Sequence, residues 1–365
     1  LIALSEVYYD TKDFNKAILY ANQALPLCGN DEQLFNRAVY LLATGYNFTN
    51  QSAKGVEILN IAATKFPESS EELFFSYSVN LYDNGYYREA VSAFNNFIEK
   101  YPNVPTKKNA SFFIAYAHYK MGEWDNAAGA FREFIKTYPD DELTAEAQFN
   151  IAEAHYNSSK FKEAVKEYQH VYTKYPKSNF SSSAYHNEAW CYYQMKKMDN
   201  MIVPLQRLIE LYPSHELVPE AQFTIGDYYY NKKDYTKALV EYKTFIDKFP
   251  DHYKTEEARS FIKELSQIDA FKEYQIAIVS FDKKDYKKAI IELGKIVENY
   301  PGTEIAMACE ANIASSYEQL GDTKKAIELY KKIIEKYKEN PSGAGVVYFS
   351  EQHLEWLSEN AISKR

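Results

Sequence analysis

The sequence has few of the residues that build turns and cross-links. Only 12 of its 365 residues are glycine and 12 are proline, which is little for the many turns of an all-β protein. Three cysteines, Cys28, Cys191 and Cys309, lie far apart and form no CxxC pair. The sequence therefore offers no zinc or dithiol motif, and we interpret the cysteines as small residues that pack between helices.

Long apolar runs and basic clusters are also missing. No stretch approaches the roughly 20 apolar residues that a membrane-spanning helix needs. The formal net charge is −9, whereas a nucleic-acid-binding protein needs a clustered basic surface. We therefore expect no membrane span in this chain and no DNA or RNA partner.

An aromatic residue followed by proline recurs along the chain. The pairs are Phe66-Pro67, Tyr101-Pro102, Tyr138-Pro139, Tyr175-Pro176, Tyr212-Pro213, Phe249-Pro250 and Tyr300-Pro301. Successive prolines are 35, 37, 37, 37, 37 and 51 residues apart. The sequence therefore has a unit of about 37 residues, and its last interval is longer by 14.

Small residues recur in step with these pairs. A second small position lies 12 residues before the proline, or before Lys338 at the equivalent place, and holds Ala90, Ala127, Ala164, Ala238, Ala289 and Ala326. A first small position lies 12 residues earlier and holds Ala43, Ser78, Ala115, Ala152, Ala189, Gly226, Ala277 and Ala314. Small side chains let two helices approach closely, and proline ends the second helix. Each unit is therefore predicted to be a helical hairpin.

The unit resembles the tetratricopeptide repeat. In several copies the first small position is followed by a turn glycine (Gly85, Gly122, Gly321), and in several by an aromatic residue (Tyr87, Trp124, Phe161, Tyr235, Tyr286) before the alanine and the proline. The resemblance implies an all-α, right-handed superhelical solenoid of about nine helical hairpins plus a C-terminal capping helix. The period and the Tyr-Pro endings are most similar to bacterial envelope members, BamD-like proteins and the Tol–Pal-associated coordinator. That likeness implies a periplasmic or outer-membrane-associated protein, and a cytoplasmic location stays open.

Three regions are expected along the chain. Residues 1–250 hold repeats one to seven, residues 251–338 hold a lengthened helix with repeats eight and nine, and residues 339–365 hold the capping helix. The first small position of repeat one is Ser5, so its first helix lacks a turn and we expect the chain to continue a longer protein or to follow a removed segment. In the capping helix, Val347, Leu354, Leu357 and Ala361 share one face, and a truncated tenth repeat is the alternative.

Two departures from the repeat carry structural predictions. Pro204 falls inside the second helix of repeat six, where an interior proline costs about 3 kcal/mol and bends the helix. The 14 extra residues before Pro301 contain neither glycine nor proline and keep a helical apolar spacing. They are predicted to extend one helix by nearly four turns.

The first helices are expected to line a groove rich in aromatic rings. The positions three before and four after the first small position, and the position just after it, supply the candidates. The candidate partner-binding residues are Tyr82, Phe112, Tyr116, Tyr119, Phe149, Tyr156, Trp190, Tyr193, Phe223 and Tyr230. Glu153 and Asp227 interleave acids with these rings. Tyr and Trp often carry binding energy at interfaces, but the same rings also serve packing alone.

No motif in the sequence supports catalysis. A nucleophile elbow, a zinc helix, a phosphate-binding glycine loop and a dinucleotide fingerprint are all missing. His118 and His155 share a position in adjacent repeats, but a packing role is favoured over a metal pair because no carboxylate ligand accompanies them. Receptors for chaperone tails carry Asn just after the first small position, and here that position holds Tyr116 and Glu153 in repeats four and five. We expect no enzyme, cofactor or metal.

The leading hypothesis is a protein-interaction scaffold that binds a peptide or partner protein in the aromatic groove, within a bacterial envelope complex. The alternatives are a structural subunit that uses convex faces and ends, or the repeat part of a longer protein with another domain. The sequence leaves the partner and the oligomeric state open.

Overall fold

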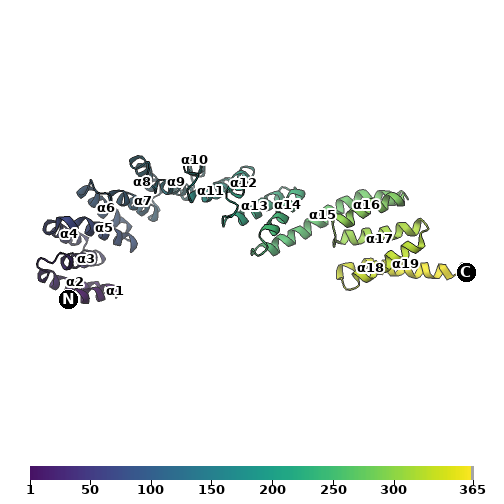
Figure 1. Ribbon diagram of the computed structural model, residues 1–365, viewed down its shortest axis with the longest axis horizontal. Coiled ribbons are helices and arrows are strands. Elements are labelled where there is room, and N and C mark those ends of the chain that lie inside the picture. Colours follow the sequence, from purple (N-terminus) through teal and green to yellow (C-terminus); the bar gives the residue numbers. More distant parts are fainter. Residues whose placement is uncertain (363–365) are drawn as a thin grey trace. The chain divides into compact units, whose positions relative to one another are not determined.

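Helices make up the protein throughout the part that the structure describes. The computed structural model describes residues 1–362, with side chains through Ser358, and this part holds nineteen α-helices, two 3-10 turns and no β-strand. Helices α1 to α18 follow one another in chain order as nine pairs, and α19 follows (Figure 1). The predicted all-α repeat fold is therefore confirmed. The helices are α1 (Ile2–Asp10), α2 (Phe14–Ala24), α3 (Glu32–Phe48), α4 (Ser52–Lys65), α5 (Pro67–Asp83), α6 (Tyr87–Lys100), α7 (Lys107–Lys120), α8 (Trp124–Thr137), α9 (Thr144–Asn157), α10 (Phe161–Lys174), α11 (Phe180–Gln194), α12 (Met198–Leu211), α13 (Val218–Asn231), α14 (Tyr235–Lys248), α15 (Thr255–Asp282), α16 (Tyr286–Asn299), α17 (Glu304–Gln319), α18 (Thr323–Tyr337) and α19 (Ala344–Ile362), and the 3-10 turns are η1 (Leu25–Leu27) and η2 (Pro341–Gly343).

The chain forms two compact units. The first runs from Leu1 to Pro204 and the second begins at Leu205, so the division falls inside α12. The predicted boundaries at residues 250 and 338 follow the repeat numbering instead and stay a prediction.

The small positions lie where the helices of each hairpin approach most closely. Ala115, Ala127, Ala152 and Ala164 have no exposed surface. At Gly226 a methyl group would come within 2.7 Å of the Tyr242 ring. Close helix packing therefore explains why these positions stay small.

One residue in the left-handed conformation joins the two helices of each hairpin. It lies seven residues after the first small position, and in the described hairpins its φ is between 58° and 81° at Lys12, Asn50, Gly85, Gly122, Ser159, Lys196, Lys233, Lys284 and Gly321. The following amide closes the helix end, as where Lys160 N–H donates to His155 O at 2.8 Å. This is a Schellman-type helix end, and six of the nine hairpins build it without glycine.

The second helices end where the proline follows. Tyr101, Tyr138 and Tyr175 have φ near −125° and ψ between 53° and 66°, because a following proline excludes the helical conformation. A hydroxyl five residues after the proline bonds back to the aromatic carbonyl, at 3.1 Å from Thr144 and 2.7 Å from Ser181. The aromatic-proline pair is thus the boundary between repeats.

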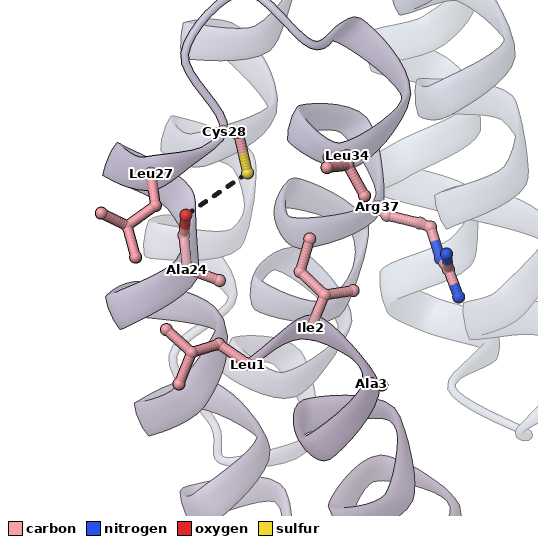
Figure 2. A pocket seen from close by; sticks show the side chains of 8 residues that line it. All are labelled: Leu1, Ile2, Ala3, Ala24, Leu27, Cys28, Leu34 and Arg37. Atoms are coloured by element: carbon pink, nitrogen blue, oxygen red, sulfur yellow. Dashed lines mark hydrogen bonds between the residues drawn. The ribbon is translucent and has the colours of Figure 1, made fainter.

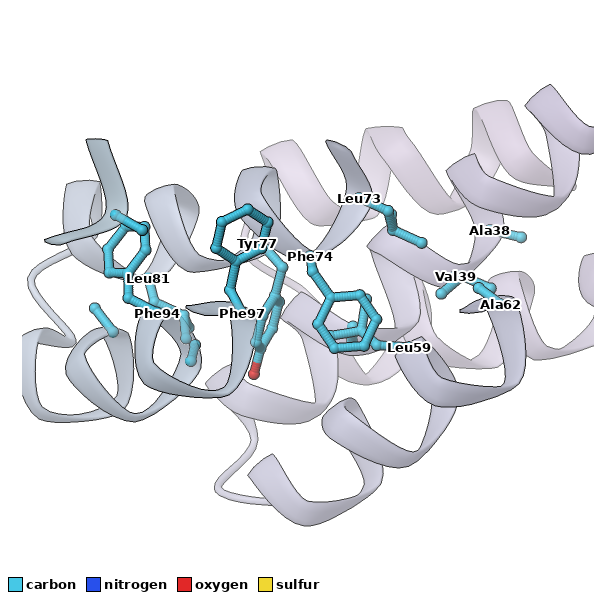
Figure 3. Close-up of a cluster of buried hydrophobic side chains, with 14 of the residues drawn as sticks. Ala38, Val39, Leu59, Ala62, Leu73, Phe74, Tyr77, Leu81, Phe94 and Phe97 are labelled. Atoms are coloured by element: carbon cyan, nitrogen blue, oxygen red, sulfur yellow. The ribbon is translucent and has the colours of Figure 1, made fainter. Parts of the chain in front are cut away.

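Aromatic side chains fill the core of the first unit between α3 and α7. Figure 3 shows Phe74, Tyr77, Phe94 and Phe97 packed in one row between the helices. Phe94 and Phe97 have no exposed surface, and full burial of such a ring contributes about 1.5–3 kcal/mol. The large rings of one hairpin fill the space that the small positions leave open.

Pro204 does not end its helix. α12 runs from Met198 to Leu211 with Pro204 inside it. Proline donates no hydrogen bond to the carbonyl of Asn200 four residues earlier. The predicted bend at this place stays a prediction.

The lengthened helix is confirmed. α15 has 28 residues, and its two halves belong to different cores of the second unit. Ala258 and Leu265 pack with the α13–α14 hairpin, whereas Ala270 and Ala277 pack with α16 and α17. The extra turns therefore place the contacts with the preceding hairpin and the contacts with the following helices on separate halves of α15.

The last helix covers the last hairpin, as predicted. Leu357 of α19 is buried against α17 and α18, with Val347 and Leu354 packed beside it. His353 Nδ1 lies 2.7 Å from Glu318 Oε2. The side chain of Ala361 lies outside the described residues.

Candidate partner-binding surface

The ten predicted binding residues differ in how much of each side chain reaches the surface. Phe112 and Phe223 are only 8% and 2% exposed. The Phe112 ring lies 5.0 Å from the ring of Phe134, and the Phe223 ring lies 5.3 Å from that of Phe245. These two phenylalanines pack against the second helices of their hairpins and present no surface to a partner.

Tyr116 and Tyr119 are half-buried and tie neighbouring first helices together. Tyr116 donates to Glu146 at 2.5 Å and accepts from Asn150 at 2.9 Å. Tyr119 accepts from Asn157 at 2.8 Å. Burial and the Glu146 carboxylate raise the pKa of Tyr116, so its hydroxyl stays a donor. Both hydroxyls therefore join one repeat to the next.

Four other rings are half-buried as well. The ring of Tyr82 lies 5.1 Å from that of Phe113, and the ring of Phe149 lies 5.6 Å from that of Tyr168. Tyr230 donates to Glu264 at 2.8 Å. The Tyr156 ring packs 5.5 Å from that of Phe161. Phe149 and Tyr156 thus contact the second helix of their own hairpin, Tyr82 and Tyr230 contact the first helix of the next repeat, and all four side chains are partly exposed.

Trp190 and Tyr193 are the most exposed of the ten. They are 39% and 46% exposed, and their rings meet edge to face with centroids 5.2 Å apart. Both belong to α11. Together with Tyr156 of α9 they form what we call the Trp190 surface.

A cavity opens beside these rings. Glu153, Tyr156, Tyr168, Asn187 and Trp190 line it, and its volume is about 110 Å³. Its residues come from α9, α10 and α11, all within the first unit. We call it the Glu153 cavity.

A chain of hydrogen bonds holds the lining of the Glu153 cavity. Tyr168 Oη donates to Glu153 Oε1, and Asn187 Nδ2 donates to the same oxygen at 2.7 Å. Trp190 Nε1 donates to His186 Nε2 at 3.0 Å, and His186 Nδ1 lies 3.1 Å from Asn187 Oδ1. These partners assign the neutral tautomer with the proton on Nδ1 to His186. The indole of Trp190 is thereby linked to the carboxylate of Glu153.

The electrostatics of Tyr168 fit this arrangement. Burial and the neighbouring Glu153 carboxylate raise the pKa of Tyr168, whose side chain has no exposed surface. The hydroxyl therefore remains protonated and donates. One oxygen of Glu153 is thus fixed in place from inside the protein.

The positions of Glu153, Tyr168 and Asn187 hold other residues in other repeats. Two repeats earlier they hold Val79, Phe94 and Phe113, and two repeats later they hold Asp227, Tyr242 and Phe261. Phe113 stacks on Phe94 with centroids 5.2 Å apart, and Phe261 stacks on Tyr242 at 5.0 Å. A phenylalanine stacks on the second-helix ring in both, whereas Asn187 beside Tyr168 donates to Glu153 and lines the Glu153 cavity.

His118 and His155 do not share a ligand set. His118 Nδ1 lies 2.7 Å from Glu123 Oε2, and His155 Nε2 lies 2.7 Å from Arg132. Burial and the Arg132 charge lower the pKa of His155. Among the described residues no group of three His, Cys, Asp or Glu side chains is placed to hold a metal ion.

The three cysteines are free and buried. Burial raises the pKa of Cys191 and of Cys309 to about 12. A buried thiol with such a pKa is inert as a nucleophile. The cysteines therefore serve as packing residues.

A larger hollow of about 430 Å³ lies between α1, α2 and α3. Figure 2 shows the side chains of Leu1, Ile2, Leu27 and Leu34 around it, with Arg37 directed away. Arg37 forms an ion pair with Glu6 at 2.6 Å. The hollow is therefore lined mainly by apolar side chains, and its one charged side chain, Arg37, is already paired with Glu6. Elsewhere, none of the helices within residues 1–362 is both long and apolar enough to cross a membrane.

Sequence reasoning missed Tyr168 and Asn187 as parts of a site. The available signal was the change from Phe to Asn eleven residues after the proline, beside an acid just after the first small position. Only a comparison of equivalent positions between repeats reveals it.

A family model matches most of the repeats. A family model described as YfiO, outer membrane lipoprotein, matches residues 67–149 and 141–332. A search of curated proteins finds no match. Among similar solved structures, the apo form of RapI is 13% identical, and the match covers 93% of this chain and 98% of RapI with a TM-score of 0.46. A tetratricopeptide repeat protein from Parabacteroides merdae is 11% identical, and the match covers 77% of this chain and 98% of that protein with a TM-score of 0.41. MamA is 18% identical, and the match covers 47% of this chain and 93% of MamA with a TM-score of 0.38. The hairpin repeat and the family match together confirm a tetratricopeptide-type protein.

Proposed function

This chain belongs to the YfiO family of outer membrane lipoproteins, and we propose that it is a non-catalytic scaffold that holds a protein or peptide partner against the Trp190 surface. Family membership supports a place in an envelope complex, in the periplasm or at the outer membrane. Fractionation of the native host tests this location, and recovery of the protein with the cytoplasm would contradict it.

The proposal rests on large aromatic side chains that are exposed and yet held in place by the protein. Trp190 and Tyr193 are exposed, yet Trp190 is held by its hydrogen bond to His186. Rigid aromatic side chains lose little conformational entropy when a partner binds, and they are frequent at binding hot spots. The Trp190 surface therefore has the features of an anchor for a partner.

The experiment combines crosslinking with substitution. A photo-crosslinking amino acid at position 190 is expected to trap the partner in the native host, and Trp190→Ala with Tyr193→Ala is expected to lower its capture at least tenfold. Val240→Ala is the matched control, since Val240 is 57% exposed on α14. Circular dichroism verifies that helicity is retained. Unchanged capture by a folded double variant would refute the Trp190 surface as the binding place.

A structural-subunit role that uses other faces is the second candidate. Ile276 of α15 and Ile291 of α16 are 74% and 63% exposed, and exposed apolar residues often mark contacts between proteins. Ile276→Ser with Ile291→Ser is expected to reduce capture of the partner in this case. The two pairs of substitutions thereby distinguish the two functions.

A further inference from the structure

The Glu153 cavity has a negative group at its base and aromatic rings at its walls. Glu153 Oε1 accepts from Tyr168 and Asn187. Within the described part of the chain, Glu153 Oε2 receives no hydrogen bond and no Lys, Arg or His forms an ion pair with Glu153. One carboxylate oxygen is thus fixed by the protein, and the other is unused.

This combination favours one kind of ligand. A carboxylate that is partly removed from water is stabilised by an opposite charge, and the faces of Trp and Tyr rings attract cations at about 0.5–2 kcal/mol each. No Lys or Arg lines the cavity, so an anionic ligand has no counter-charge there. The chemistry of the lining selects a cation.

We propose that the Glu153 cavity receives a cationic side chain of the partner polypeptide, the guanidinium of an arginine or the ammonium of a lysine. The inference rests on the proposed function, since the partner that lies against Trp190 supplies the side chain. The inference specifies the charge of the partner side chain that binds beside the aromatic rings of the Trp190 surface.

The size and support of the cavity agree with this occupant. Its volume of about 110 Å³ exceeds the roughly 30 Å³ that one water molecule takes up in the liquid, and it suits the few heavy atoms of a guanidinium or ammonium group. The bonds from Trp190 through His186 and Asn187 to Glu153 fix the lining before a ligand arrives. The net charge of −9 also favours the approach of basic segments.

The second unit supplies a control within the same protein. Asp227 accepts from Tyr242 at 2.7 Å, as Glu153 accepts from Tyr168. Phe261 stacks on Tyr242 and covers this place. An acid beside a buried tyrosine is therefore present at both places, and the first also has Trp190 and the Glu153 cavity beside it, whereas Glu264 stands at the place of Trp190 in the second.

The test uses N-acetyl-arginine amide, N-acetyl-lysine amide and the neutral N-acetyl-citrulline amide as probes. Binding is followed by the NMR signal of the Trp190 indole N–H, which is assigned by its loss in Trp190→Phe. We expect at least one cationic probe to shift this signal saturably and citrulline amide to leave it unchanged. The tighter of the arginine and lysine probes identifies the preferred side chain.

Two variants separate charge from structure. Glu153→Gln keeps an oxygen that accepts from Tyr168 and Asn187, so the fold is retained, and we expect the affinity for the cationic probe to fall at least tenfold. Asp227→Asn is the matched control and is expected to bind as the wild type does.

Three results would overturn the proposal: equal binding of citrulline amide, unchanged affinity in Glu153→Gln, or no binding of either cation at millimolar concentrations. Crosslinking at position 190 reports separately on the proposed function. Partner capture without probe binding would reject the cation site and keep the scaffold, whereas probe binding without capture would do the reverse.

Discussion

Two places at the same position of the repeat, one around Glu153 and one around Asp227, have nearly the same local chemistry and different surfaces. In both, a buried tyrosine donates to an acid on the first helix. Phe261 closes the second place by stacking on Tyr242, whereas Asn187 leaves a cavity of about 110 Å³ at the first. The two places thus differ in the side chains beside the tyrosine-acid pair, which are Asn187 and Trp190 at the first and Phe261 and Glu264 at the second.

The comparison also separates two roles of polar groups in a repeat protein. The tyrosine-acid pair stabilises the hairpin, because a buried hydroxyl without a partner would cost about 1–3 kcal/mol. The residue from the next first helix controls access of solvent and partners. Stability and binding can therefore change independently at this position.

The largest expected effect is on stability. Phe261→Ala removes a half-buried ring from the core of the second unit and is expected to cost about 2–4 kcal/mol. Asn187→Ala at the equivalent place removes the hydrogen bonds with Glu153 and His186 and is expected to cost about 1–2 kcal/mol. Denaturant unfolding, resolved by hydrogen exchange in each unit, measures both. Equal costs would contradict a larger packing contribution of Phe261.

The next effect is on binding. Asn187→Phe places a ring over Tyr168, as Phe261 lies over Tyr242, and is expected to close the Glu153 cavity. Affinity for the cationic probe should then fall at least tenfold, or about 1.4 kcal/mol, while the stability of the first unit is kept or increased. Titration of the Trp190 indole signal measures the affinity. Asn150→Phe, one repeat earlier, is the control, and full binding by Asn187→Phe would contradict the role of the open place.

A smaller effect is expected at the turns that both regions share. Lys196 and Lys233 have φ of 58° and 62°, and glycine adopts this conformation with less strain than a residue with a Cβ. Lys196→Gly and Lys233→Gly are each expected to stabilise their hairpins by about 0.5–1 kcal/mol. Gly122→Ala, at φ 73°, should have the opposite effect. Thermal unfolding of the three variants provides the check, and stabilisation by Gly122→Ala would contradict the strain argument.

The smallest effect concerns pH. Burial raises the pKa of Asp227 above its ordinary value of 3.8, so the folded protein binds this proton more readily than the unfolded chain. The associated stability is complete below pH 3.8 and is lost as the pH rises through the folded-state pKa. Wild type should therefore gain stability relative to Asp227→Asn when the pH falls from 7 toward 4. Urea unfolding at several pH values measures the difference, and a constant difference would show that Asp227 has an ordinary pKa.

Much of the fold could be predicted because steric rules repeat. Alanine or glycine at the small positions and an aromatic-proline pair at the end of each unit are local signals, and they locate the hairpins and the long α15. The left-handed turns at Lys196 and Lys233 gave no such signal, because a lysine in this conformation looks like any surface lysine in the sequence.

The site was harder to predict. Phe112 and Phe223 lie three residues before the first small position, which predicts that they face the groove, but packing against the second helices buries them. The Glu153 cavity exists where Asn187 is smaller than the phenylalanine of other repeats. A sequence pattern identifies aromatic residues that are present, but it does not show where a smaller residue leaves a cavity in the folded protein.

The two cores that share α15 have a consequence for how the second unit unfolds. In repeat proteins, cooperativity comes from interfaces between neighbours. Here the core with Ala258 and Leu265 and the core with Ala270 and Ala277 are joined through the backbone of a single helix. We therefore expect the coupling between neighbouring cores to be weakest at the middle of α15.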